Sequence, residues 1–213
     1  MKKTLVALIA MAGSAGAAPL TLTSPEGGAL TSRQAPLQWS EDIAELQSWE
    51  LSFTLNDKEV GTVSLFGTRQ SGNEAGIVLG VTADGALSIF NYKVGTEDSY
   101  RKTTGNGWVS AGQDTSITLS YVADVNTSDT VVGGTFTITS GSKTQSFVMD
   151  DDSLISFTSL KNDGGTRFYT NGSAHTFSNI SVSQLSNRVV PEPATATLSL
   201  LALCGLAARR RRH

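Results

Sequence analysis

The stretch WELSFTL, residues 49–55, decides the fold class of this chain. Its apolar residues alternate with polar ones and are Trp49, Leu51, Phe53 and Leu55. A period of two places all four apolar side chains on one face of an extended chain and the polar ones on the other. The stretch therefore predicts a β-strand with one face in a hydrophobic core.

Similar alternation recurs on both sides of this strand. The dipeptide Asp84-Gly85 separates strands predicted at 76–83 and 86–92, and it accepts the positive φ angles of a type I′ hairpin turn. A four-residue loop, 56–59, is expected to join 49–55 to a strand at 60–66 in another hairpin. Further strands are predicted at 115–122, 134–139, 144–148, 166–170 and 177–185, the last with a slip in register. Residues 41–47, after a Ser40 cap, are predicted to form a helical turn.

About ten to twelve short strands, with turn residues at a spacing of about 8–12, predict an all-β fold. The strands are not separated by long helices, which argues against a parallel α/β sheet. No fixed repeat is present, which disfavours a propeller or a solenoid. The prediction is an antiparallel two-sheet jelly-roll sandwich that occupies residues 18–188.

Composition excludes several classes of protein. Charged residues make up 16% of the 213 residues, against a typical value of about 25%, which argues against a disordered or long-helical chain. The single cysteine, Cys204, excludes a disulfide scaffold and a thiolate-rich metal site. Residues 18–190 contain ten basic and 18 acidic residues, a net charge of −8, so no nucleic-acid partner is expected.

The N-terminus has the three parts of a secretory signal peptide. Two lysines follow Met1, the apolar run 5–12 comes next, and Ala15 and Ala17 fit the A-x-A cleavage rule. An apolar run this short cannot cross a hydrocarbon core of about 30 Å. Residues 1–17 are therefore predicted to form a signal helix that is removed on export.

The C-terminus also has three parts. Pro191, Glu192 and Pro193 precede the apolar run 194–208, and Arg209, Arg210, Arg211 and Arg212 close the chain before His213. As a helix the run would rise about 22 Å, which is short for a permanent membrane anchor. The arginines would hold the end of the chain on the cytoplasmic side, and the two prolines keep the junction extended for a protease.

This tail resembles the PEP-CTERM sorting signal of Gram-negative bacteria over residues 189–213. The resemblance implies that an exosortase-type membrane protease recognises and removes the tail. It also implies that the chain is held transiently in the inner membrane and is then delivered to the outer cell surface or the extracellular matrix. An ordinary tail anchor is the alternative.

The body resembles the laminin-G-like and concanavalin A-like jelly-roll superfamily over most of residues 20–186. The resemblance rests on the strand 49–55, the hairpin 76–92, Trp108-Val109-Ser110 with the strand 117–121 after it, and the closing strand 177–182. It implies a jelly roll, and in many members of the superfamily calcium lies near the ligand-binding loops.

Two sets of residues are candidates for a binding site. Trp108, Tyr92 and Tyr169 are expected near loop ends, where an exposed ring would stack on a sugar. Asp150, Asp151 and Asp152 are a candidate calcium site, because a hard cation relieves the repulsion among adjacent carboxylates. The run lacks the alternating spacing of a dedicated calcium loop, so a solvated turn is the alternative.

Catalysis has little support in the sequence. Residues 41–45, EDIAE, are the nearest match to the paired-carboxylate strand of glucanases, but they lie outside a clear strand. His175 is the one histidine before the tail, which argues against zinc catalysis. The prediction is an exported, non-catalytic protein with a candidate glycan-binding jelly roll and no cofactor beyond candidate calcium. The alternatives are a glycan-cleaving enzyme of the same fold and a purely structural matrix protein.

Overall fold

The computed structural model describes residues 34–36, 45–57, 63–68, 75–93, 100–150, 152–160, 166–169 and 175–190. The regular structure of these residues consists of strands and one 3₁₀ turn, η2 (Ile155–Phe157), which confirms the all-β prediction. No helix within these ranges has the length and apolar character needed to cross a membrane. The predicted signal helix with Ala15 and Ala17, and the tail from Pro191 to Arg212, lie outside the described residues.

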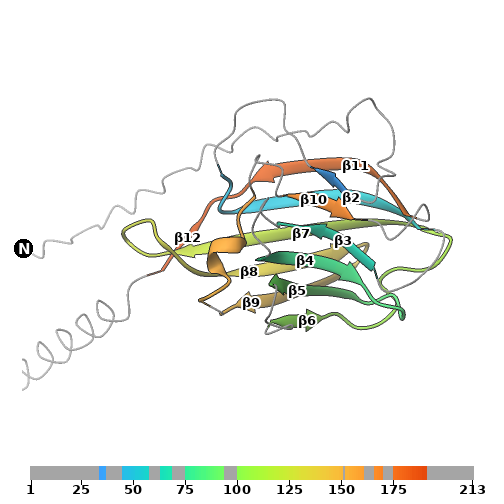
Figure 1. Cartoon of the computed structure of the whole chain (residues 1–213), viewed down its shortest axis with the longest axis horizontal. Helices are drawn as coiled ribbons and strands as arrows, with labels where there is room; N and C mark the ends of the chain where they lie inside the picture. The colour runs from blue at the N-terminus through green and yellow to red at the C-terminus, as the bar shows by residue number, and fades with distance from the viewer. Residues whose placement is uncertain are drawn as a thin grey trace, which may run out of the picture.

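Two sheets face each other (Figure 1). The first, here the β4 sheet, has the order β1 (Gln34–Pro36), β10 (Arg167–Tyr169), β3 (Val63–Gly67), β4 (Ala75–Val81), β5 (Leu87–Lys93), β6 (Arg101–Thr103). The second, here the β7 sheet, has the order β11 (His175–Gln184), β2 (Trp49–Asp57), β7 (Asp114–Val125), β8 (Val131–Ser140), β9 (Lys143–Met149). Neighbours within each of these orders are antiparallel, while β12 (Arg188–Val189) runs parallel to the end of β7. The two-sheet prediction is confirmed.

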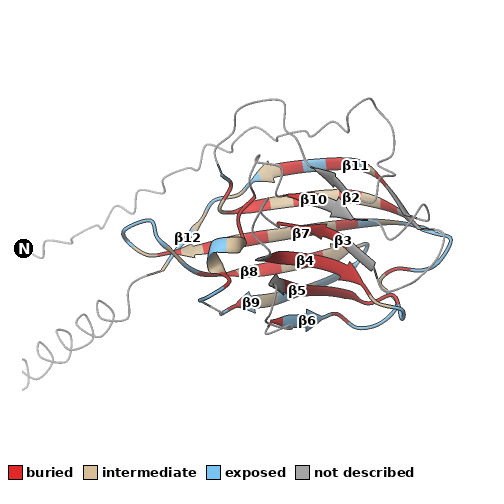
Figure 2. Ribbon diagram, viewed as in Figure 1, coloured by how far each residue is buried: buried red, intermediate tan, exposed pale blue. Residues whose placement is uncertain are grey.

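The β7 sheet has an apolar inner face and a hydroxyl-rich outer face. Along β7 every second residue from Ile117 to Val125 is buried, and the residues between them are partly exposed (Figure 2). On the outer face, Ser52 and Thr118 of neighbouring strands form a hydrogen bond of 2.9 Å. Serine and threonine side chains account for many of the outward positions, which is consistent with the low proportion of charged residues in the sequence.

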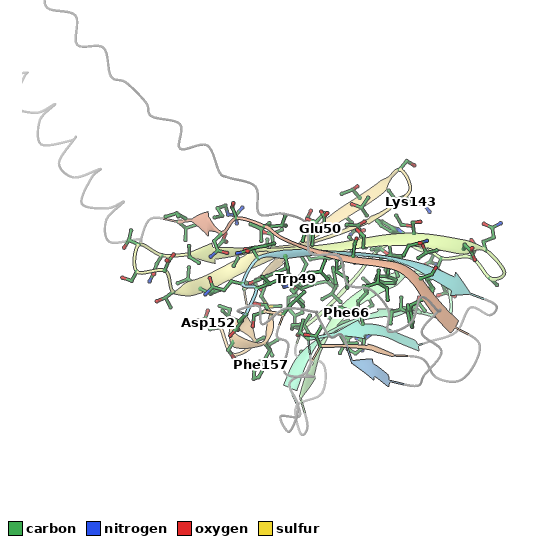
Figure 3. All side chains as sticks on the ribbon, turned by 90° about the horizontal axis from the view of Figure 1, so that it is seen from above. Trp49, Glu50, Phe66, Lys143, Asp152 and Phe157 are labelled. Atoms are coloured by element: carbon green, nitrogen blue, oxygen red, sulfur yellow. The ribbon has the colours of Figure 1, made fainter. Side chains whose placement is uncertain are left out.

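Trp49 lies at the centre of the core. Its side chain is fully buried, and its ring centroid lies 5.9 Å from that of Phe66, which comes from the opposite sheet (Figure 3). Phe136 and Tyr121 of its own sheet lie at 6.3 Å and 6.4 Å. The stretch 49–55 therefore forms the core strand that its alternation predicts.

A second close contact joins β7 to β8. The Tyr121 hydroxyl donates to the carbonyl of Gly133 at 2.9 Å, and burial raises the pKa of this phenol. The ring lies directly over Gly134, where an added Cβ would be 2.3 Å from the Tyr121 hydroxyl oxygen and 2.4 Å from Cζ. Glycine is required at position 134, because any side chain there would overlap the Tyr121 ring.

The predicted hairpin between 49–55 and 60–66 is wrong. β2 pairs with β11 and β7, while β3 pairs with β10 and β4 in the other sheet. The chain thus changes sheet between β2 and β3. Alternation shows which face of a strand is buried, but strands of both sheets bury a face in the same core, so it does not reveal the pairing partner.

The turn at Asp84-Gly85 is correctly located, but its predicted type is wrong. Gly85 has φ +70°, whereas Asp84 is not among the described residues with positive φ, as a type I′ turn would require. The Gly85 N–H donates to the Thr82 carbonyl at 3.0 Å, and the Thr82 N–H donates to the Ala86 carbonyl at 2.9 Å. These bonds form a three-residue loop, in which a type I turn is followed by a left-handed glycine.

Two other local predictions have opposite outcomes. The register slip in the last long strand is confirmed: β11 shifts on β2 between Ser178 and Ser181, and Asn179 has φ +52°. The helical turn at 41–47 is not found in its described part, residues 45–47, where Leu46 forms an isolated bridge with Leu160. The hydrogen bonds from Leu160 replace those that a helical turn would have supplied.

We predict that Gly134→Ala destabilises the protein by about 1–3 kcal/mol, because the new methyl group overlaps the Tyr121 ring in a packed core. Gly105→Ala is the matched control, since a Cβ at Gly105 meets nothing within 4 Å. Urea unfolding of both variants measures the difference. Equal stabilities would show that the approach of Tyr121 is not tight.

Candidate functional site

A cavity of about 660 Å³, here the η2 pocket, opens at one end of the sandwich. Its described lining residues are Glu45, Gln47, Thr130, Val131, Val132, Asp152, Ile155, Ser156, Thr158 and Ser159. They come from three places in the chain: the segment before β2, the start of β8, and η2 with its flanking residues. The volume falls within the range of about 300–1,000 Å³ that is common for small-molecule sites.

The bridge between Leu46 and Leu160 brings two of these segments together. Leu46 N–H donates to the Leu160 carbonyl at 2.9 Å, and Leu160 N–H donates back at 3.0 Å. Both leucine side chains are buried, which holds the bridge in the core. As a result Glu45 lies beside Ser159, whose hydroxyl donates to the Glu45 carboxylate.

η2 is fixed to both sheets. The indole N–H of Trp49, in β2, donates to the Thr158 carbonyl at 2.9 Å in the buried interior. Thr68, which follows β3, donates its hydroxyl to the Phe157 carbonyl. The Thr158 hydroxyl also closes the turn by donating to the Ile155 carbonyl at 2.8 Å. The η2 turn, which lines the pocket, is therefore hydrogen-bonded to both sheets.

The last described segment supports the Gln47 wall. Asn187 donates its side-chain amide to Gln47 Oε1 at 2.8 Å and accepts from the Ser48 hydroxyl at 2.6 Å. The Ser48 Oγ in turn accepts from the backbone N–H of Ala123 at 2.8 Å. Gln47 is thereby tied both to the β7 sheet and to the C-terminal segment.

The C-terminal segment is itself held along β7. Arg188 donates two hydrogen bonds, of 2.5 Å and 2.7 Å, to the Asp124 carboxylate. The Val190 N–H donates to the Val125 carbonyl at 2.8 Å. The hydrogen bonding along β7 thus continues to Val190, the residue directly before Pro191. Val190 bonds to the end of β7 that also pairs with the start of β8.

The chemistry of the lining is mixed. Glu45 and Asp152 provide carboxylates, and Gln47 provides an amide; four hydroxyls come from Thr130, Ser156, Thr158 and Ser159. Val131, Val132 and Ile155 provide an apolar surface, and Val132 is 44% exposed. Among the described lining residues there is no lysine, arginine or histidine. Such a surface is suited to a small molecule with many hydroxyl groups and apolar C–H faces.

The candidate calcium residues have different surroundings. Asp152 is exposed and lines the η2 pocket (Figure 3). Asp150 is exposed close to Tyr100, whose phenol pKa is raised by burial first and by the charge of Asp150 second. Asp151 lies outside the described residues. The described residues contain no group of three or more acidic, histidine or cysteine side chains that could hold a metal ion.

Trp108 lies at the other end of the sandwich from the η2 pocket. Its N–H donates to the Gly85 carbonyl at 2.8 Å, and its half-buried ring packs against the core. The Lys143 ammonium donates to the Gly107 carbonyl at 2.7 Å and lies 6.0 Å from the Trp108 ring centroid. Lys143 and Asp152 mark the two ends in Figure 3.

The other two predicted aromatics are not on the same element as Trp108. Tyr92 is in β5 opposite Gly76, near the end of that strand away from Gly85. Tyr169 is in β10 opposite Gln34, with β3 and β4 between it and β5. The structure describes the backbones of these two tyrosines but not their side chains. The backbone therefore does not bring the three aromatics to one place.

The sequence did not reveal the pocket as a unit. Glu45 belongs to the run 41–45, the nearest match to the glucanase motif, and Asp152 belongs to the aspartate run 150–152, so the sequence assigns them to two different candidate sites. The contact that joins the segments is long-range, since Glu45 and Ser159 are 114 residues apart. No local pattern signals such a pairing.

Comparisons with known proteins address the fold alone. No family model and no curated protein matches the chain. Among solved structures it is similar to a native heptameric SAP-like pentraxin from Limulus polyphemus, with 11% identity, 79% of this chain and 76% of the pentraxin covered, and a TM-score of 0.44.

Two further structures are similar to a comparable degree. The CBM40 of a Ruminococcus gnavus IT-sialidase, bound to α2,3-sialyllactose, has 13% identity, coverage of 66% and 78%, and a TM-score of 0.42. Sheep galectin-11, in complex with glycerol, has 8% identity, coverage of 70% and 95%, and a TM-score of 0.42. All three are jelly-roll folds of the lectin type. Similarity at this level concerns the fold alone and does not indicate which ligand this chain binds.

Proposed function

We propose that this chain is an exported, non-catalytic protein that binds a saccharide in the η2 pocket at the cell surface or in the extracellular matrix. The observation that carries the proposal is the pocket itself, whose lining places hydroxyls, carboxylates and an amide next to an aliphatic patch. Sugar hydroxyls donate to carboxylates and exchange hydrogen bonds with serine and threonine, while sugar C–H faces contact aliphatic side chains.

Export and sorting are the second part of the proposal. The signal peptide at 1–17 and the Pro-Glu-Pro tail at 189–213 support processing by an exosortase-type protease in the inner membrane. The sheet supports it too, because hydrogen bonding continues to Val190 and leaves the body complete when the chain is cut beyond that residue. Removal of the tail would then release a folded domain.

A glycan-cleaving enzyme is the second candidate, because Glu45 and Asp152 line the same pocket. Glycoside hydrolysis uses two carboxylates, one as acid and the other as nucleophile or base. The Ser159 hydroxyl donates to Glu45, which suits a binding carboxylate as well as a catalytic one. Binding needs no defined separation of the two groups, so it is the simpler function for this lining.

We predict that filling the pocket weakens saccharide binding. Ser156→Trp and Thr130→Trp each place a large side chain at an exposed lining position, and each should weaken binding more than about tenfold. Ser142→Trp, at the exposed β8–β9 turn of the opposite end, is the matched control and should bind as the wild type does. A glycan array with the full-length chain in a glycan-free detergent identifies a bound oligosaccharide, and calorimetry then measures the variants. Unchanged affinity in both pocket variants, or no bound glycan at all, would contradict the proposal.

We predict that the double variant Pro191→Ala/Pro193→Ala leaves full-length protein in the inner membrane, because the motif that the protease recognises is lost. Pro25→Ala, a proline substitution far from the tail in sequence, should be processed normally. Fractionation followed by immunoblotting measures both outcomes. Normal processing of the double variant would rule out an exosortase-type signal.

We predict that the wild-type protein and the Glu45→Gln variant release reducing sugar from polysaccharides at the same background rate. Loss of one of two catalytic carboxylates lowers hydrolysis by orders of magnitude, whereas a binding protein has no activity to lose. A reducing-end assay over a panel of neutral, acidic and amino polysaccharides makes the comparison. Hydrolysis by the wild type that is lost in the Glu45→Gln variant would favour the enzyme instead.

A further inference from the structure

We infer that Gln47 is a specificity-determining residue of the η2 pocket and gives it a preference for saccharides that carry an acetamido group. Asn187 orients the Gln47 amide and is therefore a positioning residue. The inference rests on the proposed function of the pocket as a saccharide site, and it concerns the class of sugar that is bound.

A chain of hydrogen bonds fixes the orientation of the Asn187 side chain. It begins at the backbone N–H of Ala123, which can only donate and which bonds to Ser48 Oγ at 2.8 Å. Ser48 is buried, and its own hydroxyl donates to Asn187 Oδ1 at 2.6 Å, a length typical of an O–H···O bond. If the Asn187 amide were turned over, the Ser48 hydroxyl would lose this acceptor in the interior, which is unfavourable. Asn187 therefore turns its oxygen to Ser48 and its nitrogen to Gln47.

The same chain decides which end of the Gln47 amide a ligand meets. Asn187 Nδ2 donates to Gln47 Oε1 at 2.8 Å, so the oxygen of Gln47 is engaged. Gln47 is half-buried and lines the pocket, and within the described part of the chain its amide nitrogen has no acceptor. Gln47 therefore offers a ligand its NH₂ group, which donates two hydrogen bonds and accepts none.

The rest of the lining offers few other donors. Gln47 alone among the described lining residues has a side-chain nitrogen. The Thr158 hydroxyl donates to the Ile155 carbonyl, and the Ser159 hydroxyl donates to Glu45, so these two hydroxyls offer a ligand only their oxygens. A carbonyl group of a ligand can only accept, and it is therefore matched by Gln47 and not by these hydroxyls.

An acetamido group combines the features that suit this lining. Its carbonyl oxygen accepts from Gln47, its N–H donates to a lining oxygen, and its methyl group contacts the apolar side chains of Val131, Val132 and Ile155 in the same cavity. A sugar hydroxyl in its place has no methyl group, and its oxygen is a weaker acceptor than an amide carbonyl. The added hydrogen bond contributes between about twofold and tenfold to affinity, and burial of the methyl group up to about fourfold.

The test uses two neutral probes, chitotetraose and cellotetraose, which differ only in having an acetamido or a hydroxyl group at C2 of each sugar. Calorimetry on the full-length chain in a glycan-free detergent should show chitotetraose bound at least about fivefold more tightly. The Gln47 side-chain NH₂ signals in the NMR spectrum of the isotope-labelled chain should shift on adding chitotetraose, because this group forms the new bond.

Asn187→Asp tests the orientation without changing a lining residue. The aspartate still accepts from the Ser48 hydroxyl, but it also accepts from the Gln47 nitrogen, so Gln47 turns its oxygen to the ligand. The preference for chitotetraose should fall to within about twofold. Asn106→Asp makes the same change at an exposed position of the Trp108 end and should keep the full preference.

Gln47→Glu is a second variant of the same size. It keeps an acceptor for Asn187 Nδ2 and replaces the donor nitrogen by an oxygen. It should weaken chitotetraose binding by about fivefold and leave cellotetraose binding within about twofold of the wild type.

The outcomes separate the inference from the proposed function. Affinities of the wild type within twofold for the two probes, tighter binding of cellotetraose, or a glycan array on which only sugars without acetamido groups bind would overturn the preference and leave saccharide binding intact. A preference that survives in both Asn187→Asp and Gln47→Glu would overturn the role of Gln47. No binding of either probe, together with an empty glycan array, would overturn the proposed function and the inference together.

Discussion

The pocket depends on one buried hydrogen bond. The indole N–H of Trp49 donates to the Thr158 carbonyl in the interior, where neither group could be satisfied by water. A buried donor without a partner costs about 1–3 kcal/mol, so this bond favours the observed position of the η2 turn against the core strand β2. Thr158 in turn closes η2 on Ile155 and precedes Ser159, which contacts Glu45. Trp49, the core residue that the sequence identifies first, is therefore also hydrogen-bonded to the turn that lines the η2 pocket.

The two ends of the sandwich differ in the side chains that a ligand could contact. At the Trp108 end, a lysine lies over the ring and bonds to the backbone, and the ring packs on the core. At the η2 end, polar side chains line a cavity whose walls are fixed by the bridge at Leu46 and by Asn187. The segment that leads to Pro191 belongs to this second end, because Asn187 supports Gln47. The last described residues before Pro191 and the proposed saccharide pocket therefore lie at the same end of the molecule.

Much of the fold was predictable from local pattern. Alternation in 49–55 and along β7 identifies the buried faces, and the irregular spacing after Phe177 identifies the bulge at Asn179. The partner of each strand was not predictable, because β2 and β3 bury equivalent faces in one core. The site was still less predictable: Glu45 and Ser159 meet through a bridge between distant segments, and the aromatics that composition singles out do not share an element.

The most direct measurement is an NMR titration of the isotope-labelled chain with a neutral oligosaccharide that it binds. The central claim is that the ligand occupies the η2 pocket, which predicts that amide shifts concentrate in residues 45–47, 130–132 and 155–159. The Trp49 indole N–H signal should move with them, since it bonds to Thr158. Shifts that gather instead around Trp108 and Lys143, with residues 155–159 unchanged, would contradict the claim.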